Sequence, residues 1–335
     1  RHGKVVYDKS YKVDYDSKYS KEAKEPSALN AHDPSGPYNY FNPWWHPFYR
    51  RSRLHTLQSV TKTITSIIIG VAVKRREFPS LDTPILKFFD TSKVANIDDR
   101  KRRITIRHLL TMSAGFDWNE DLPYNDPNNS ASVMEASFDW VQLVIDRRMA
   151  KEPGTLFNYN SGATQVLTHI FRIATGKDVE EYAARHLFAP LGIEQFYWKR
   201  TPTGLPDTEG GLYLAAHDLA KIWYLFLMNG KWEANQIVEP EWVKASVTPS
   251  ITVSPDGIKY GLKWWLVPYS SDSSQFAWAG SGFGGQLPIA IQEYDLLMVF
   301  TGWNIIPKKP RLRRAIAMDR ILRAVIGRPS SDTKK

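Results

Sequence analysis

A glycine-rich segment stands directly before two alternating apolar segments in the last quarter of the chain. The stretch WAGSGFGGQ at 278–286 contains the spacing G-x-G-x-x-G. In a dinucleotide-binding fold a helix follows this spacing. Residues 287–302 instead alternate between apolar and polar positions around a turn near Asp295, which predicts a β-hairpin. A Rossmann fold is therefore excluded here. Glycines beside a strand can let backbone N–H groups approach a substrate carbonyl, although a bulge without chemistry shows the same pattern.

A serine and a lysine lie three residues apart at the start of a predicted helix. The stretch QSVTK at 58–62 precedes apolar residues at helical spacing, which are Ile64, Ile67, Ile68, Val71 and Ala72. Side chains three positions apart share a helix face, so Ser59 and Lys62 point the same way. A serine hydroxyl becomes a nucleophile when a nearby base takes its proton. The pattern therefore makes Ser59 a candidate nucleophile, while a capping serine beside a solvated lysine is the alternative.

A turn-rich loop carries a tyrosine to the entrance of a second helix. The stretch PGTLFNYNSG at 153–162 precedes an apolar helical pattern that Gly176 closes. Tyr159 is thus predicted on a loop at a helix start. A neighbouring lysine can lower the pKa of a tyrosine, which would let Tyr159 share the role of base for Ser59. Taken alone, a loop tyrosine is more often a half-buried aromatic residue.

The order of these motifs resembles the serine β-lactamase and penicillin-binding protein superfamily, whose signature combines S-x-x-K with two later motifs. The stretch ITIRHLLTMSAG at 104–115, PLGI at 190–193, Tyr260-Gly261 and Gly-Gly-Gln at 284–286 also match. The resemblance covers residues 3–304, and the tyrosine motif is similar to the class C-like branch. That branch includes family VIII carboxylesterases and 6-aminohexanoate-dimer hydrolases.

The resemblance implies roles for individual residues. Ser59 would be the acylated nucleophile, Lys62 its proton partner and Tyr159 the second base. The oxyanion hole would combine the N–H of Ser59 with one N–H from 280–285. The oxyanion and substrate-binding residues would be Gly280, Ser281, Gly282, Ser161 and Trp278.

Two departures from the family pattern bear on the substrate. Ser161 stands where the family often has asparagine, and Trp278 or Gly280 replaces the Lys or His that opens the third motif. That cation helps to hold a substrate carboxylate, unless Lys259 or Lys263 supplies one from a neighbouring strand. Both departures favour esters and short linear amides over β-lactams.

The resemblance implies an α/β (α+β) fold, in which an antiparallel sheet flanked by helices is combined with a mostly helical domain. Residues 1–74 and 201–335 would form the sheet domain, residues 75–200 the helical domain, and the active site would lie between them. Residues 3–7 resemble the second strand of the family's opening hairpin, so the first strand would be missing.

Composition restricts the remaining classes of function. The chain has 335 residues with 42% hydrophobic content, enough for a large core, and no apolar run as long as a membrane span. Its net charge of +9 comes from scattered clusters without a nucleic-acid motif. It has no cysteine, and its eight histidines are dispersed, so we expect neither a metal nor a cofactor. A homodimer is a family-level expectation. If a leader was removed before Arg1, a periplasmic or secreted location is favoured over a cytoplasmic one.

Two segments could form the rim of the active site. Residues 14–53 lack clear periodicity and contain many aromatic residues, including Trp45. Residues 117–129 are rich in Asp, Asn and Pro, and Trp118 and Tyr124 there could contact the substrate. Each segment could equally be a packed surface loop.

The sequence therefore predicts a serine hydrolase that forms an acyl-enzyme on Ser59 and cleaves carboxylic esters or short linear amides. A β-lactamase or D-alanyl-D-alanine peptidase is the first alternative. A catalytically silent binding module of the same fold is the second.

Overall fold

Helix α2 (Val60–Lys74) is buried along nearly its whole length. Every residue from Val60 to Ala72 is buried. A helix that is apolar or small on all sides is stable only inside a protein. The predicted helix after Ser59 is thus confirmed, and its N-terminus lies within the core of the molecule.

The computed structural model describes residues 1–30, 32–36, 39, 41, 53–269, 274–305 and 314–326. The other α-helices are α1 (Tyr15–Lys18), α3 (Asp99–Arg102), α4 (Ile106–Leu110), α5 (Ser130–Glu135), α6 (Trp140–Ile145), α7 (Ser161–Thr175), α8 (Val179–Ala183), α9 (Ala216–Leu227), α10 (Pro240–Ser246) and α11 (Arg314–Ile326). A π-helical turn, Ala184–Phe188, follows α8.

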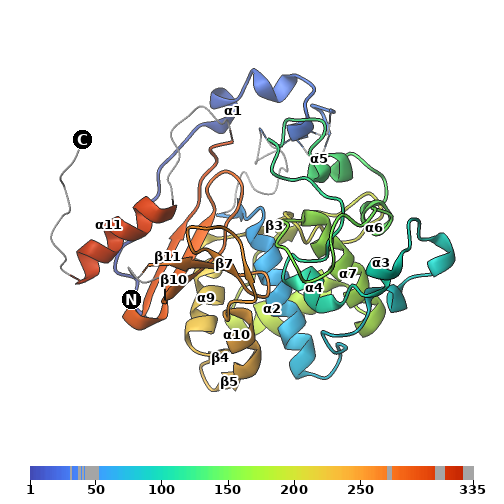
Figure 1. Cartoon of the computed structure of the whole chain (residues 1–335). Coiled ribbons are helices and arrows are strands. Elements are labelled where there is room, and N and C mark those ends of the chain that lie inside the picture. Colours follow the sequence, from blue (N-terminus) through green and yellow to red (C-terminus); the bar gives the residue numbers. More distant parts are fainter. Residues whose placement is uncertain are drawn as a thin grey trace.

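The strands form one large and two small antiparallel sheets. They are β1 (His55–Thr56), β2 (Tyr197–Trp198), β3 (Leu212–Leu214), β4 (Lys231–Trp232), β5 (Asn235–Gln236), β6 (Ile251–Thr252), β7 (Lys259–Tyr260), β8 (Trp265–Pro268), β9 (Phe276–Ala279), β10 (Leu287–Ile291) and β11 (Leu296–Phe300). The large sheet has the order β11-β10-β9-β8-β7-β6, and a small sheet has the order β1-β3-β2. Figure 1 shows α2 between the large sheet and the group of α4, α6 and α7.

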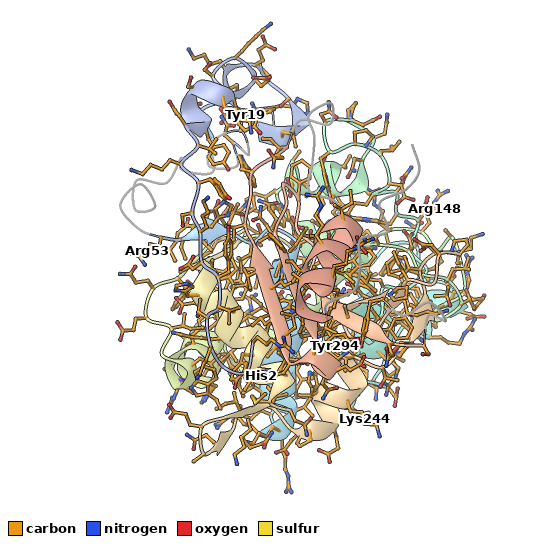
Figure 2. All side chains as sticks on the ribbon, turned by 90° about the vertical axis from the view of Figure 1, so that its left-hand side faces the viewer. His2, Tyr19, Arg53, Arg148, Lys244 and Tyr294 are labelled. Atoms are coloured by element: carbon orange, nitrogen blue, oxygen red, sulfur yellow. The ribbon has the colours of Figure 1, made fainter. Side chains whose placement is uncertain are left out.

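The predicted hairpin after the glycine-rich segment is confirmed. Strands β10 and β11 pair antiparallel, with Ile289 opposite Met298. Asp295 closes the turn with a left-handed φ of 43°, a conformation that Asp tolerates better than most residues. Helix α9 packs on the inner face of this hairpin. On the outer face Met318 of α11 is buried with Ile289 and Ile291, and Figure 2 looks onto α11 lying across the hairpin.

The expected N-terminal strand at 3–7 is not formed. The side chains of Val5, Val6 and Tyr7 are 75%, 74% and 75% exposed, and the backbone of this segment does not pair with β11. A strand next to the sheet needs a continuous ladder of backbone hydrogen bonds. Near this end of the described chain only His2 contacts Asp295, through one backbone bond from His2 N to Asp295 O and one side-chain contact. The division into 1–74 with 201–335 and 75–200 stays a prediction.

Two observations concern membranes and metals. Within the described ranges, no helix combines the length and apolar character needed to cross a bilayer. The same ranges contain no group of three His, Cys, Asp or Glu side chains placed to hold a metal ion.

Candidate active site

Ser59 and Lys62 meet at the N-terminus of α2. The short strand β1 pairs with β3, and Leu57 N donates to Leu212 O just before the helix starts. Gln58 has a left-handed φ of 48°, a strained conformation that concentrates at functional sites. Lys62 Nζ donates to Ser59 Oγ at 2.9 Å. The residue pair predicted from the spacing is therefore in direct contact.

Lys62 also binds a residue far away in the sequence. Its Nζ donates to the carbonyl oxygen of Glu209 at 2.6 Å and to Glu209 Oε2 at 3.1 Å. The lysine side chain is 1% exposed and the glutamate side chain 7% exposed. An ammonium group has three donors, and Ser59 and Glu209 together accept all three. Burial opposes the charge of Lys62, but Tyr159, Glu209 and Glu120 raise its pKa overall, so it rests as an ammonium ion.

Tyr159 completes the cluster. Asn160 caps α7, because its side chain accepts from Ala163 N at 2.8 Å. This cap sets the position of the residue before it. The hydroxyl of Tyr159 lies close enough to Ser59 and Lys62 that both lower its pKa, and Lys62 Nζ lies 5.2 Å from the ring centre. Burial raises the pKa of Tyr159 while Lys62 opposes this, so its resting form is the neutral phenol.

The glycine-rich segment lies next to the residues that lead into α2. A Cβ atom on Gly282 would come within 2.4 Å of Leu57 O, so only glycine allows this approach. The N–H groups of Gly280 and Gly282 donate to Pro288 O and Gln286 O. Those of Ser281 and Phe283 alternate with them and have no backbone partner in the described chain. We therefore expect the oxyanion donor at Ser281 or Phe283 rather than at Gly280 or Gly282, together with Ser59 N–H.

Glu120 is a functional candidate that the sequence analysis missed. Its Oε1 accepts from Tyr124 Oη at 2.9 Å and from Ser161 Oγ at 2.6 Å. Its Oε2 accepts from Trp118 Nε1 at 2.9 Å and Ser161 N at 2.8 Å. Burial raises the pKa of Glu120. The carboxyl group thus ties the rim loop to the first turn of α7 and steadies the backbone that carries Tyr159.

Glu209 was missed as well, because only the pairing of β1 with β3 brings it to Lys62. Burial opposes its charge, yet Lys62 and a hydrogen bond with Glu135 lower its pKa overall. The turn that holds it is fixed by Asp207 Oδ1, which accepts from Glu209 N at 3.2 Å and Gly210 N at 2.9 Å. No short motif signals either glutamate.

Other predicted residues lie away from Ser59 or deeper in the protein. Trp118 and Trp278 are 5% and 8% exposed and belong to the hydrophobic core. Ser161 is buried, and its hydroxyl donates to Glu120 Oε1. Tyr124 is half-buried, with its ring 5.1 Å from that of Phe283. Trp45 falls outside the described residues.

Neither lysine considered as a substitute for the third-motif cation is suitably placed. Lys263 is 1% exposed, and its Nζ donates to Met112 Sδ at 3.2 Å. Burial lowers the pKa of Lys263 well below its usual value, which disfavours its charged form. Lys259 lies on β7 and donates to Thr252 Oγ1 of the edge strand at 2.8 Å.

The family assignment rests on a match along almost the whole chain. The family model described as Beta-lactamase matches residues 1–317. The chain belongs to this family. Its antiparallel sheet, flanking helices and Ser59–Lys62 pair agree with the fold that the sequence predicted.

Individual relatives of the family are more distant. The monacolin J acid methylbutanoyltransferase of Aspergillus terreus is 28% identical over 155 residues, which cover 43% of this chain and 37% of that protein. The 6-aminohexanoate-dimer hydrolase of Paenarthrobacter ureafaciens is 22% identical over 233 residues, covering 63% and 57%. The chain thus spans about a third to three fifths of the length of these curated relatives.

A solved structure shares the fold. The octameric penicillin-binding protein homologue from Pyrococcus abyssi superposes with a TM-score of 0.62 and 22% identity, covering 82% of this chain and 66% of that one. At this identity the likeness concerns the fold alone.

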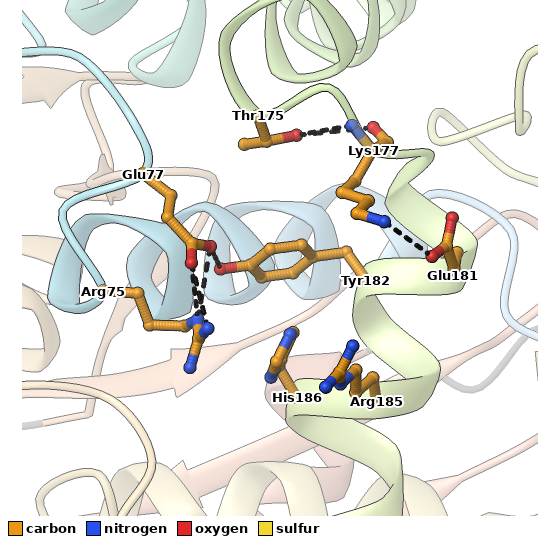
Figure 3. A pocket seen from close by; sticks show the side chains of 8 residues that line it. All are labelled: Arg75, Glu77, Thr175, Lys177, Glu181, Tyr182, Arg185 and His186. Carbon is orange, nitrogen blue, oxygen red and sulfur yellow. Dashed lines mark hydrogen bonds and ion pairs between the residues drawn. The ribbon is translucent and has the colours of Figure 1, made fainter.

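A polar cavity of about 160 Å³ lies at the opposite end of α2. It is shown in Figure 3 and lined by Arg75, Glu77, Thr175, Lys177, Glu181, Tyr182, Arg185 and His186. Arg75 Nη2 donates to Glu77 Oε1 at 2.9 Å, and Tyr182 Oη donates to Glu77 Oε2. These bonds join the C-terminal end of α2 to α8. The cavity is far from Ser59, because α2 rises roughly 1.5 Å per residue over its length.

We expect Tyr182→Phe to lower the free energy of unfolding by about 1 kcal/mol, since it removes one hydrogen bond to a carboxylate at a buried ring. Urea unfolding followed by circular dichroism measures this change. Tyr11→Phe is the control, because that side chain is 73% exposed. Equal stabilities of the two variants would contradict the expectation.

Proposed function

We propose that this protein is a serine hydrolase that cleaves carboxylic esters or short linear amides through an acyl-enzyme on Ser59. The observation that supports it most is the contact of Lys62 Nζ with Ser59 Oγ at 2.9 Å, with the ring of Tyr159 centred 5.2 Å from the same Nζ. A nucleophile, a proton-transfer group and a fixed cation are thus within reach of one carbonyl group. The free N–H groups near Ser59 suit the negative oxygen that forms on attack.

Acylation follows from this geometry. Tyr159 first loses its phenol proton to solvent, and Ser59 Oγ then bonds to the carbonyl carbon while its proton passes to the phenolate oxygen of Tyr159. When the tetrahedral intermediate collapses, the bond to the leaving oxygen or nitrogen breaks, and Tyr159 delivers a proton to that atom. Lys62 remains an ammonium ion and stabilises negative charge on the tyrosine oxygen during the transfer.

Deacylation uses the same groups in reverse. A water molecule gives a proton to Tyr159 Oη and bonds to the acyl carbon. The ester bond to Ser59 Oγ then breaks, and the proton returns from Tyr159 to the serine oxygen. The free acid leaves, and the resting hydrogen bonds are restored.

Acyl transfer is a second candidate outcome of the same intermediate. The relative from Aspergillus terreus is named as a methylbutanoyltransferase, and an alcohol can attack an acyl-enzyme in place of water. A β-lactamase is less well supported, because Gly280 has no side chain with which to hold a substrate carboxylate.

The test compares p-nitrophenyl butyrate with the chromogenic cephalosporin nitrocefin on the purified protein, and adds a fluorophosphonate that labels active serines. We expect rapid ester turnover, slow nitrocefin turnover and labelling of Ser59. Ser59→Ala should abolish all three. Adding an alcohol during ester turnover would yield a new butyrate ester if acyl transfer competes with hydrolysis.

Each alternative gives a different result. Dominant nitrocefin cleavage would favour the β-lactamase. Absence of both turnover and labelling would favour the binding module. Turnover that survives Ser59→Ala would contradict the proposed nucleophile.

A further inference from the structure

Aromatic rings line the side of the site that carries Tyr159. The ring of Trp265 stacks on that of Tyr159, with centres 5.8 Å apart and planes 29° from parallel. The ring of Phe157 meets Trp265 edge-on at 5.9 Å. Tyr260 supports both rings from the core at 5.1 Å and is 1% exposed. Phe157, Tyr159 and Trp265 are each half-buried, so one part of each residue faces away from the core. We call these three residues the aromatic wall.

The position of the aromatic wall follows from the proton path. Tyr159 lies beside Lys62, whose Nζ is 5.2 Å from its ring centre, and in the proposed mechanism Tyr159 Oη gives a proton to the leaving atom. The leaving group must therefore extend from Ser59 toward Tyr159 and the rings beside it. Trp265 pairs with Ala279 on β9, the residue before Gly280. The wall thus stands beside the strand where other family members carry the third-motif cation.

The surroundings of Gly280 leave no space for a side chain. A Cβ atom there would lie 2.9 Å from Pro288 Cγ and 3.0 Å from the Trp223 ring. Both distances are shorter than ordinary van der Waals contacts. The packing of α9 and β10 therefore fits a glycine and opposes a lysine or histidine.

The nearby lysines do not supply the missing charge to a leaving group. Lys62 and Lys263 are each 1% exposed. The three donors of Lys62 are taken by Ser59 and Glu209, and Lys263 donates to a methionine sulfur. A carboxylate placed against the aromatic wall would lose its hydration without gaining either partner, which is costly.

We propose that the aromatic wall is the leaving-group subsite and that it selects esters whose alcohol portion is uncharged and aromatic. Flat rings would stack on Trp265 and Phe157, and anionic alcohol portions would be rejected. This inference rests on the proposed serine hydrolase function. It adds the chemistry of the leaving group, which that function leaves open.

The test uses three butyrate esters that differ only in the alcohol: ethyl, benzyl and 4-carboxybenzyl. All three form the same butyryl-enzyme, so their deacylation steps are identical and kcat/KM reports differences in acylation. Benzyl and 4-carboxybenzyl alcohols leave with similar intrinsic ease, so a difference between them reflects the negative charge. We expect benzyl butyrate to exceed both others in kcat/KM by about tenfold or more.

Variants at Trp265 connect this preference to the aromatic wall. Trp265→Ala should lower kcat/KM for benzyl butyrate by about tenfold, while the value for ethyl butyrate changes less than about twofold. Trp265→Phe keeps a ring and should retain most of the preference. Trp232→Ala is the matched control, because Trp232 on β4 is a half-buried tryptophan packed on Tyr224. It should leave all three values unchanged.

Two kinds of failure can be told apart. If fluorophosphonate labels Ser59 and esters are cleaved, but 4-carboxybenzyl butyrate reacts as fast as benzyl butyrate, the leaving-group proposal is wrong. An equal loss for ethyl and benzyl esters in Trp265→Ala would also overturn it, since that pattern reflects damage to Tyr159. If Ser59 is not labelled and no ester is cleaved, the proposed hydrolase function itself fails.

Discussion

Replacing Lys62 with methionine is expected to lower kcat/KM for p-nitrophenyl butyrate by about 10³. Methionine has a similar length and an apolar end, so the buried space next to Ser59 stays filled. The charge that stabilises Tyr159 Oη during proton transfer is lost, together with the hydrogen bond to Ser59 Oγ. Steady-state kinetics of ester hydrolysis measure the effect. Retention of more than about a tenth of the activity would remove Lys62 from the mechanism.

Glu209→Gln separates the charge of Lys62 from its position. Glutamine can still accept a bond from Lys62 Nζ, but the carboxylate that raises the pKa of this lysine is gone. The groups that face Lys62 are Tyr159, Glu209 and Glu120, with Lys263 nearby, whose pKa is lowered by burial. Removing one negative neighbour lowers the pKa of Lys62, so the ammonium form is lost at a lower pH. The high-pH limb of the kcat/KM profile should therefore move to lower pH. An unchanged profile with reduced activity would indicate a packing role only.

Replacing Lys199 with methionine is expected to lower the free energy of unfolding by about 3–5 kcal/mol. Lys199 Nζ lies 3.4 Å from Asp207 Oδ2, and the two side chains are 2% and 0% exposed. Removing one partner leaves a buried charge without compensation. Because Asp207 also fixes the turn that carries Glu209, part of the effect should appear as weaker activity. Denaturant unfolding measures the stability change.

A double variant tests whether this loss comes from the unpaired charge. Lys199→Met combined with Asp207→Asn should be more stable than the sum of the two single losses predicts, by about 1 kcal/mol or more. The surface pair Lys177–Glu181 is the control, with side chains 51% and 61% exposed. Lys177→Met should change stability by less than about 0.5 kcal/mol. Additive losses at Lys199 and Asp207 would show that the pair is not coupled.

Several features of this protein follow from local patterns in the sequence. Ser59 and Lys62 lie on one face of α2 because three residues make nearly one helical turn. Helix α7 begins after Asn160 and ends at Gly176, whose φ of 67° is left-handed, since capping residues and a final glycine satisfy the helix ends. The alternation at 287–300 is sufficient to predict the β10–β11 hairpin.

Other expectations depended on partners that the local pattern does not contain. Residues 3–7 have the composition of a strand but remain unpaired and exposed. Trp118 and Trp278 are candidate contacts to substrate, and most of each side chain packs in the core. In each case the residue type is compatible with both environments, and the neighbours contributed by other segments decide between them.

The sequence alone determined the fold class, the family and the order of the three motifs, because these depend on residue type and on spacing along the chain. Only the tertiary structure brought Glu209 to Lys62, Glu120 to Ser161 and Trp265 to Tyr159. It also decided which N–H groups near 280–283 have partners in the sheet. Glu120 and Ser161 are 41 positions apart in the sequence, and Lys62 and Glu209 are 147 positions apart. They arise from strand pairing and burial, which bring distant segments together and produce no periodic pattern in the sequence.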